Sequence, residues 1–250
     1  MQSFLTLTRR ELSAYFLSLS GYVIISAALF LLGFSFVVLL VNLQQETTPL
    51  PLTEYFYITP FFWYILLLST PVITMRLFAL EKFSGTFETL MTAPVTDLQV
   101  VLAKFVAGLV FYLALWLPLV GCLFSVRHYT SDPSALELGA LAGTFIGILL
   151  LGGVFISLGC CASALTRSQV TAAMISLGFG GSLFLVGVLA EHIPLRVTWQ
   201  TQVLASLSFF EQMHDFSRGI VDTRPVVLYL SLTLFFLFLT LRVVESRRWK

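Results

Sequence analysis

The sequence has few charged residues and few cysteines, and both shortages limit what the protein can be. Only 11% of its 250 residues are charged, whereas a soluble domain carries about 25%. The chain therefore has too few charges to cover the surface of a water-soluble globule. Its net charge of +1 provides no basic field for nucleic acid. The three cysteines all lie inside apolar runs and offer no disulfide framework.

The sequence also lacks the motifs with which a chain binds nucleotide or a catalytic metal. It contains no GxxxxGK[ST] phosphate loop, no GxGxxG, no HExxH and no CxxC. We therefore expect no catalytic, cofactor-binding or metal site in this chain. Any energy-driven work must draw its energy from another protein.

Apolar residues, in contrast, make up 58% of the chain, and the mean hydropathy is +0.93. A membrane-spanning helix needs about 20 apolar residues, and six runs have that length. Because a helix satisfies its own backbone hydrogen bonds in lipid, we predict an all-α membrane protein with one domain over 1–250. The six predicted spans are 22–41, 60–80, 105–126, 139–163, 170–190 and 225–244.

The basic residues predict which ends of the spans face the cytoplasm, because Lys and Arg are enriched in cytoplasmic loops. With both termini inside, ten of the 14 basic residues are cytoplasmic and four are outside. The ten are Arg9, Arg10, Arg76, Lys82, Lys104, Arg167, Arg242, Arg247, Arg248 and Lys250. The four are Arg127, Arg196, Arg218 and Arg224. The sequence therefore predicts a multi-pass protein with both termini cytoplasmic.

The first residues, 2–19, form a two-faced segment before the first span. Apolar side chains recur at helical spacing, whereas Arg9, Arg10 and Ser13 fall on the other side. A helix of this kind lies in the headgroup plane with its apolar face down. The alternative is a solvated helix packed on the end of the bundle.

The segment 81–95, EKFSGTFETLMTAPV, follows the second span on the predicted cytoplasmic side. Interpreted as one helix that ends at Pro94, it has an apolar face with Phe83, Phe87, Leu90 and Met91. Its other face carries Glu81, Gly85, Glu88 and Thr92. Such a helix can bury its apolar face in lipid, in the bundle or in a partner's groove. The residues alone leave all three open.

The predicted outer segment 191–224 has a helical pattern of its own, and we expect a helix that lies in or re-enters the outer leaflet. The apolar positions of this pattern are Trp199, Val203, Leu207, Phe210 and Met213. The charged residues Arg218, Asp222 and Arg224 can form ion pairs, or contact lipid headgroups or an extracytoplasmic partner. Glu211 and His214 share a helix face, but no further ligands at diagnostic spacing accompany them, so we favour a solvated loop over a metal site.

Glycines repeat every fourth residue on the fourth predicted span, at Gly139, Gly143 and Gly147. This spacing lets two helix backbones approach closely. The partner helix can belong to the same chain or to a second copy.

The pattern E-x-x-x-G-T-x-x-x-L-x-x-x-P-V at 81–95 resembles the first cytoplasmic loop of ABC-2 type transporter permeases. The tail 216–250 is similar to the end of the gliding-motility-type permeases in that class, except that Pro225 stands where an acidic residue is expected. The resemblance covers essentially the whole chain. It implies that 81–95 is a coupling helix, seated in a cleft of a separate cytoplasmic ATPase, with a second contact at 165–169.

The same resemblance implies the residues that take part in coupling, and ATP and magnesium would bind only in the partner. The implied coupling residues are Glu81, Phe83, Gly85, Thr86, Phe87, Glu88, Leu90, Pro94 and Arg167. Among them, Glu81 and Glu88 would meet basic residues of the ATPase, and Phe87 would fill a pocket there.

The resemblance thus implies an exporter permease of the bacterial cytoplasmic membrane. It would work with two ATPase subunits and a second identical or related permease, and it leaves room for an extracytoplasmic accessory protein. The spans are nearly free of charge, which suits an amphiphilic, lipid-linked or polymeric substrate. Two alternatives need no ATPase: a secondary carrier or channel, and a membrane assembly factor. Ion-coupled carriers usually need an ionisable residue within the membrane, and the predicted spans have none in their middle.

Overall fold

The structure is a computed structural model that describes residues 2–45, 52–88, 95–130, 138–192 and 208–248. Every regular element in these ranges is a helix, so the prediction of an all-α fold is confirmed. The long helices are α2 (Leu19–Gln45), α4 (Pro60–Thr74), α7 (Asp97–Thr130), α8 (Leu138–Leu165), α9 (Gln169–His192) and α12 (Thr223–Arg248). The shorter helices are α1 (Gln2–Phe16), α3 (Leu52–Ile58), α5 (Ala79–Ser84) and α11 (Phe209–Ser217).

Six helical stretches in the described ranges are long and apolar enough to cross a membrane, and each overlaps one of the predicted spans. The third differs most, because α7 begins at Asp97, well before the predicted start at 105. Its start is defined by a capping box in which Thr96 and Gln99 each bond the other's backbone N–H through a side-chain oxygen, at 3.3 Å. The extra turns carry Lys104, whose charge is neutralised by carboxylates described below.

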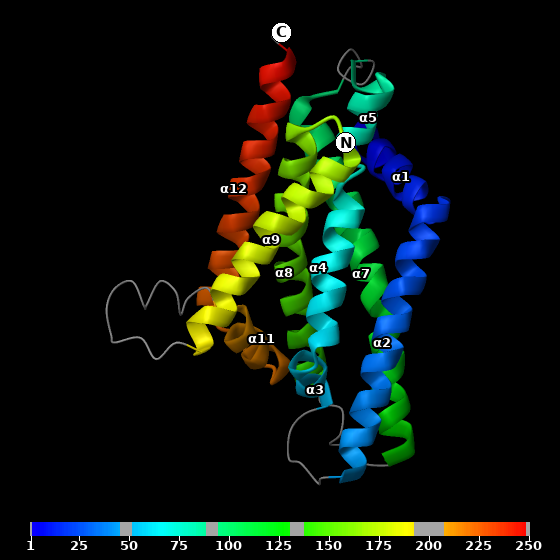
Figure 1. Cartoon of the computed structure of the whole chain (residues 1–250), viewed down its shortest axis with the longest axis vertical. Coiled ribbons are helices and arrows are strands. Elements are labelled where there is room, and N and C mark those ends of the chain that lie inside the picture. The colour runs from blue at the N-terminus through cyan, green and yellow to red at the C-terminus, as the bar shows by residue number, and fades with distance from the viewer. Residues whose placement is uncertain (1, 46–51, 89–94, 131–137, 193–207, 249–250) are drawn as a thin grey trace, which may run out of the picture.

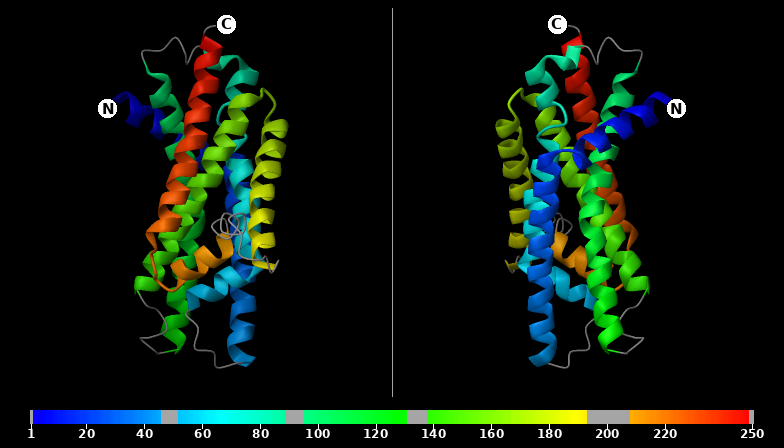
Figure 2. Two further views of the ribbon diagram at one scale, coloured as in Figure 1. Left: turned by 90° about the vertical axis from the view of Figure 1, so that its left-hand side faces the viewer. Right: turned by 90° about the vertical axis from the view of Figure 1, so that its right-hand side faces the viewer.

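Helix α8 lies at the centre of the bundle, with α4, α7, α9, α11 and α12 packed against it (Figures 1 and 2). It is the most buried of the six spans: 72% of its apolar stretch is buried inside the structure, compared with 22–28% for α2, α9 and α12. Small residues make this possible: a Cβ on Gly152 would overlap the ring of Tyr112, and one on Gly159 would overlap Thr74. A movement of α8 would therefore displace most of the other helices in the bundle.

The two ends of the bundle carry different short helices. Both termini lie at the end that carries α1 and α5, whereas α3 and α11 lie toward the opposite end (Figure 1). The amphipathic segment predicted at 2–19 forms α1, which ends at Phe16 and packs against α7 at a steep angle to the long helices (Figure 2). It leaves Leu5 62% exposed, and Leu17 and Leu19 just after it are more than 80% exposed. This exposed apolar surface suits a position at the membrane interface.

The predicted packing glycines on α8 contact α11 of the same chain. A Cβ on Gly143 would overlap the carbonyl oxygen of Phe216, and one on Gly147 would lie 2.9 Å from the sulfur of Met213. No atom of the described residues lies within 4 Å of a Cβ on Gly139, but the backbone of Gly139 is what a Cβ on Gly219 would strike. This row of glycines on α8 therefore provides the surface on which α11 of the same chain packs.

Two matched alanine substitutions test this seat. We expect Gly143→Ala to lower the free energy of unfolding by about 1–3 kcal/mol, because its Cβ meets backbone that cannot rotate away. Gly139→Ala meets nothing within 4 Å and should change it by less than about 0.5 kcal/mol. Thermal unfolding of the purified protein in lipid nanodiscs measures both. Equal effects of the two substitutions would contradict this packing.

Candidate functional site

Helix α5 and the residues after it hold most of the coupling residues that the sequence predicts. The prediction of one continuous helix over 81–95 is wrong, because α5 ends at Ser84 and Gly85 has a left-handed φ of 74°. This conformation favours glycine and commonly ends a helix. Among the described residues, no atom beyond its chain neighbours lies within 4 Å of a Cβ placed on Gly85. The left-handed turn is therefore what requires glycine at this position. The predicted coupling residues Leu90 and Pro94 lie outside the described residues.

Because of this break, the side chains do not fall on the two faces that the sequence predicts. Phe83 is 79% exposed, whereas Phe87 is only 9% exposed and lies under the ammonium of Lys82, 5.3 Å from its ring centre. Glu81 is largely buried, but Glu88 is exposed. We call the exposed residues of this segment the α5 surface: Phe83, Ser84, Gly85, Thr86 and Glu88. It offers a partner one large apolar side chain, hydroxyl groups and one negative charge.

The start of α5 is held by the C-terminal end of the central helix α8. Ser163 Oγ accepts hydrogen bonds from the backbone N–H groups of Phe78 and Ala79, both at 3.1 Å. The first N–H groups of a helix have no partner within it, so Ser163 acts as a cap supplied from another helix. Lys82 adds a second link by donating from Nζ to the carbonyl oxygen of Ala164. These bonds attach α5 to the most buried helix of the bundle.

Four charged side chains attach α5 to α1 and α7. Lys104 on α7 is 3% exposed, and its Nζ lies 2.8 Å from Glu81 Oε1 and 3.1 Å from Glu11 Oε1. Arg10 Nη2 reaches the same two carboxylate oxygens at 3.2 and 2.9 Å. Two cations thus alternate with two anions from α1 and α5, which neutralises the charge of the buried lysine. We call this set the charge cluster.

The charge cluster changes the acidity of Glu11. Burial alone would raise the pKa of this carboxyl, but Lys104 and Arg10 outweigh burial and hold it below its ordinary value. Glu11 therefore stays ionised at neutral pH. Because its folded-state pKa is lowered, its stabilising contribution is present above its unfolded pKa and is lost as the pH falls through the lowered value.

A further set of hydrogen bonds joins the end of α1 and the start of α2 to the end of α4 and the turn that follows it. Tyr15 donates from its hydroxyl to the carbonyl oxygen of Ile73 at 2.8 Å. Arg76 donates to the hydroxyls of Ser18, at 3.3 Å, and Ser20. These bonds fix the residues just before α5, while Ser163 and the charge cluster bind α5 itself to α8, α7 and α1.

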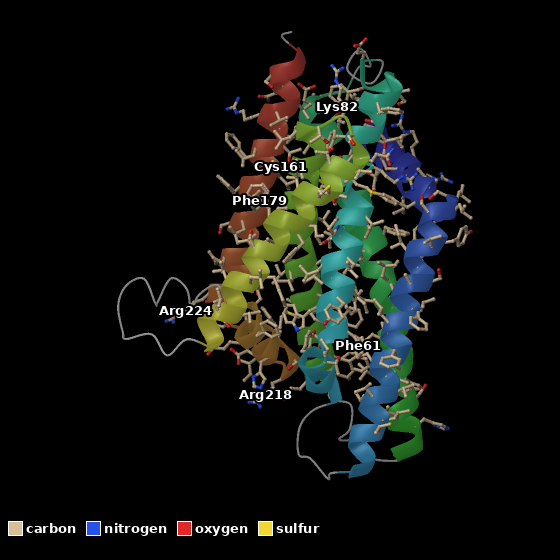
Figure 3. The ribbon with its side chains drawn as sticks, in the orientation of Figure 1. Phe61, Lys82, Cys161, Phe179, Arg218 and Arg224 are labelled. Atoms are coloured by element: carbon tan, nitrogen blue, oxygen red, sulfur yellow. The ribbon has the colours of Figure 1, made fainter. Side chains whose placement is uncertain are left out.

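The second predicted contact, 165–169, forms the turn between α8 and α9. Arg167 is exposed in this turn, and Ser168 Oγ accepts from the N–H of Thr171 at 3.4 Å to cap α9. Helix α5 contacts both α8 and α9. Both predicted coupling segments therefore lie at the same end of the bundle, where Figure 3 labels Lys82.

At the opposite end, α11 forms part of the predicted outer helix. It begins at Phe209, and the predicted positions Trp199, Val203 and Leu207 lie outside the described residues. Phe210 packs against Trp63, with ring centres 4.2 Å apart. Arg218 pairs with Glu54 of α3, an acid that the sequence analysis did not single out.

Asp222 and Arg224, the other charged residues predicted to act at this end, form no ion pair with any described residue. Asp222 instead accepts a hydrogen bond from the backbone N–H of Arg224 at 3.2 Å, at the exposed start of α12. Within the described ranges no three His, Cys, Asp or Glu side chains gather as metal ligands would. The solvated interpretation of Glu211 and His214 must still be modified, since His214 contacts Glu54.

Comparison with known proteins adds one finding. The sequence model of a family described as "ABC-2 family transporter protein" matches residues 39–242. No curated protein matches the chain. The matched range includes α4, α5, the turn between α8 and α9, and most of the membrane-spanning helices.

The cap supplied by Ser163 can be tested without a partner. Ser163→Ala removes the only side-chain acceptor described for these two N–H groups, and losing a cap costs about 0.5–2 kcal/mol. We expect hydrogen exchange of the α5 amides to accelerate by about threefold to thirtyfold. Ser157→Ala is the matched control, because Ser157 is equally buried on α8 but bonds only Val154 of its own helix. If α5 exchanged no faster in Ser163→Ala than in Ser157→Ala, the cap would contribute nothing.

Proposed function

We propose a transport mechanism for this chain, which belongs to the ABC-2 transporter family. As a member, it is a membrane permease subunit of an ABC transporter, and an ABC ATPase is its partner. We infer further that it is a non-catalytic exporter subunit whose ATP and magnesium bind in two copies of that separate ATPase. A second permease, identical or related, completes the transporter. The similarity of its tail to gliding-motility-type permeases supports that subfamily.

One observation carries the coupling proposal: the α5 surface is exposed, while the rest of α5 is tied to the bundle. Exposed residues such as Phe83 and Glu88 are free to contact an ATPase. The bonds to Ser163 and Lys104 would then pass a force on α5 to α8 and α7. A loop that only covered the end of the bundle, in contact with water, would need neither a buried lysine nor a cap supplied by another helix.

The mechanism follows from these attachments. ATP is a ligand that favours the closed state of the two ATPase subunits. When they close, the cleft that holds the α5 surface moves, and α5 transmits the motion because it is bonded to α8, α7 and α1. Since α8 is packed against most other helices, the bundle tilts as a rigid body. The exposed turn with Arg167 gives the ATPase a second point of contact.

The structure changes which coupling residues we expect to touch the ATPase. Glu81 and Phe87 were predicted to do so, but Glu81 is occupied in the charge cluster and Phe87 is buried. We propose that both position the loop, and that Phe83 provides the apolar contact and Glu88 the charged one. Gly85 and Thr86 would lie between them at the turn.

The location and the substrate remain proposals supported by composition. The ten-to-four distribution of basic residues supports a cytoplasmic position for α5 and both termini, in the bacterial inner membrane. The apolar spans support an amphiphilic, lipid-linked or polymeric substrate. At the other end, the exposed Asp222 and Arg224 are available to lipid headgroups or to an extracytoplasmic accessory protein.

Substitutions on the α5 surface test the docking. Truncating or reversing an interface anchor typically costs over about 2 kcal/mol, which is more than about thirtyfold in affinity. We therefore expect Phe83→Ala and Glu88→Arg each to weaken retention of the ATPase on the tagged permease by at least that factor. Pull-down of the complex from gently solubilised membranes measures retention.

Phe179→Ala is the matched control for Phe83→Ala, since Phe179 is also exposed, at 63%, but lies on α9 away from α5 (Figure 3). Phe87→Ala should instead destabilise the loop itself. Full retention in Phe83→Ala and Glu88→Arg, with normal membrane insertion, would contradict the docking surface. Purification of the native chain with no ATPase at all would favour a carrier or an assembly factor.

A further inference from the structure

A groove lies on the surface of the bundle between the first half of α2 and the second half of α4, and we call it the α2–α4 groove. Ala27 and Ala28 of α2 and Ser69 of α4 line it, and their small side chains leave the space that larger ones would fill. Val23 and Leu68 also line it and are 59% and 54% exposed, so the groove is open to the surroundings of the bundle. Every lining residue except Ser69 is apolar, which favours an apolar occupant over water.

The dimensions of the α2–α4 groove match a stretch of hydrocarbon chain. Its volume is about 180 Å³, and an apolar cavity of about 150 Å³ is large enough to hold benzene. It is therefore too small for a helix. Along α2 it runs from Val23 to Leu31, which is about 12 Å at 1.5 Å per residue. One leaflet contributes about 15 Å of hydrocarbon, so the groove fits within the leaflet at the α1 end.

A basic side chain lies at the end of the groove nearest α1. Arg76 follows Val72, the last lining residue on α4, by four positions. Its guanidinium donates to the hydroxyls of Ser18, at 3.3 Å, and Ser20, at the start of α2. These partners are neutral, and no described carboxylate forms an ion pair with Arg76. The groove therefore has an apolar body and a positively charged head.

The surroundings of Arg76 carry more positive than negative charge. On α1 and on 76–84, four basic side chains stand against two carboxylates: Arg9, Arg10, Arg76 and Lys82 against Glu11 and Glu81. Glu11 lines a small hollow beside Arg76, but both carboxylates are already paired with Arg10 and with Lys104 of α7. Basic sites between membrane helices attract the anionic headgroups of lipids. The charge of Arg76 is thus available to such a group.

We propose that the α2–α4 groove holds one acyl chain of an anionic phospholipid, and that the phosphate of this lipid contacts Arg76 and the hydroxyls of Ser18 and Ser20. The lipid is a resident of the site and not a transported molecule, so the inference stands apart from the proposed transport function. A second copy of the chain suits the groove less well, because a two-fold interface would bring two basic ends of the same sign together. Bound lipid would join the start of α2 to the end of α4 and so stabilise the residues that lead into α5.

Photo-crosslinking of lipid to the protein tests this site. The full chain, with any subunits that purify with it, is placed in nanodiscs of phosphatidylcholine. These contain a trace of phosphatidylglycerol that carries a diazirine in the middle of one acyl chain. After irradiation, peptide mass spectrometry scores the adducts on Val23–Leu31 and Ile65–Val72, which are the groove adducts. Adducts on the exposed face of α12 measure contact with bulk lipid.

We expect the groove adducts to exceed those on α12 at least about fivefold, and to be displaced by unlabelled phosphatidylglycerol but not by inorganic phosphate. Arg76→Gln should lower them about fivefold, which corresponds to about 1 kcal/mol for one basic residue near the headgroups. Arg76→Lys should keep them. Arg242→Gln is the matched control, because it removes the same charge on α12, across the bundle from α2 (Figure 1).

Ala27→Phe tests the apolar body of the site without touching Arg76. Its ring should fill the groove and lower the groove adducts by at least the same factor, with the adducts on α12 unchanged. Ser26→Phe is its matched control, because Ser26 is an exposed neighbour on α2 that does not line the groove.

The proposal needs both Arg76→Gln and Ala27→Phe to lose the groove adducts, so native labelling in either variant would overturn it. Equal labelling of the groove and α12, or equal groove labelling by a phosphatidylcholine probe, would mean bulk lipid only and would also overturn it. Displacement by inorganic phosphate would indicate an anion site without a lipid. Crosslinks that join α2 to a second copy of the chain would assign the groove to an interface instead.

Discussion

The central constraint on this molecule is that a buried charge must be paired. An apolar chain with 11% charged residues can bury few of them, and among the described residues the two most deeply buried are Lys104 and Glu54. Each lies near one end of the bundle and draws partners from other helices. Because an unpaired buried charge is costly, these pairings determine where the short helices at the two ends are held. The long helices could form without them, but α5 and α11 would then lose the charged contacts that add to their packing on α8.

The central helix α8 connects these two ends. Ser163 near its last turn caps α5, and Gly143 near its start seats α11. The helix between them is largely buried and rich in small residues, so its neighbours pack closely along its length. A packed interior transmits displacement better than it absorbs it. This gives a physical route by which a partner acting on α5 can influence the helices near α11.

Hydropathy was sufficient to predict the six long helices and α1, because long apolar runs and an amphipathic period are local signals. The break at Gly85 was not predicted, because the alternation of apolar and polar residues continues across the glycine. That pattern does not reveal whether the backbone stays helical there or turns left-handed. That error placed Phe83 and Phe87 on one face, whereas the fold exposes the first and buries the second. Capping by Ser163 left no local signal either.

Contacts between residues that lie far apart in the sequence could not be predicted from the sequence alone. Glu54 lies in a short helix between the first two predicted spans, and its partner Arg218 follows 164 residues later. Nothing in the spacing of either residue indicates the other. The burial of Lys104 was missed for the same reason, because Glu11 and Glu81 become its neighbours only when α1 and α5 meet on α7.

The claim that the α5 surface docks on a separate ATPase is tested most directly by a photo-crosslinking residue in place of Phe83. Irradiation of intact membranes should join the permease to one protein, and mass spectrometry should find a GxxxxGK[ST] phosphate loop in it. The same residue in place of Phe179, on the exposed side of α9, should not capture that protein. Crosslinks from position 83 only to lipid or to the permease itself would contradict the account.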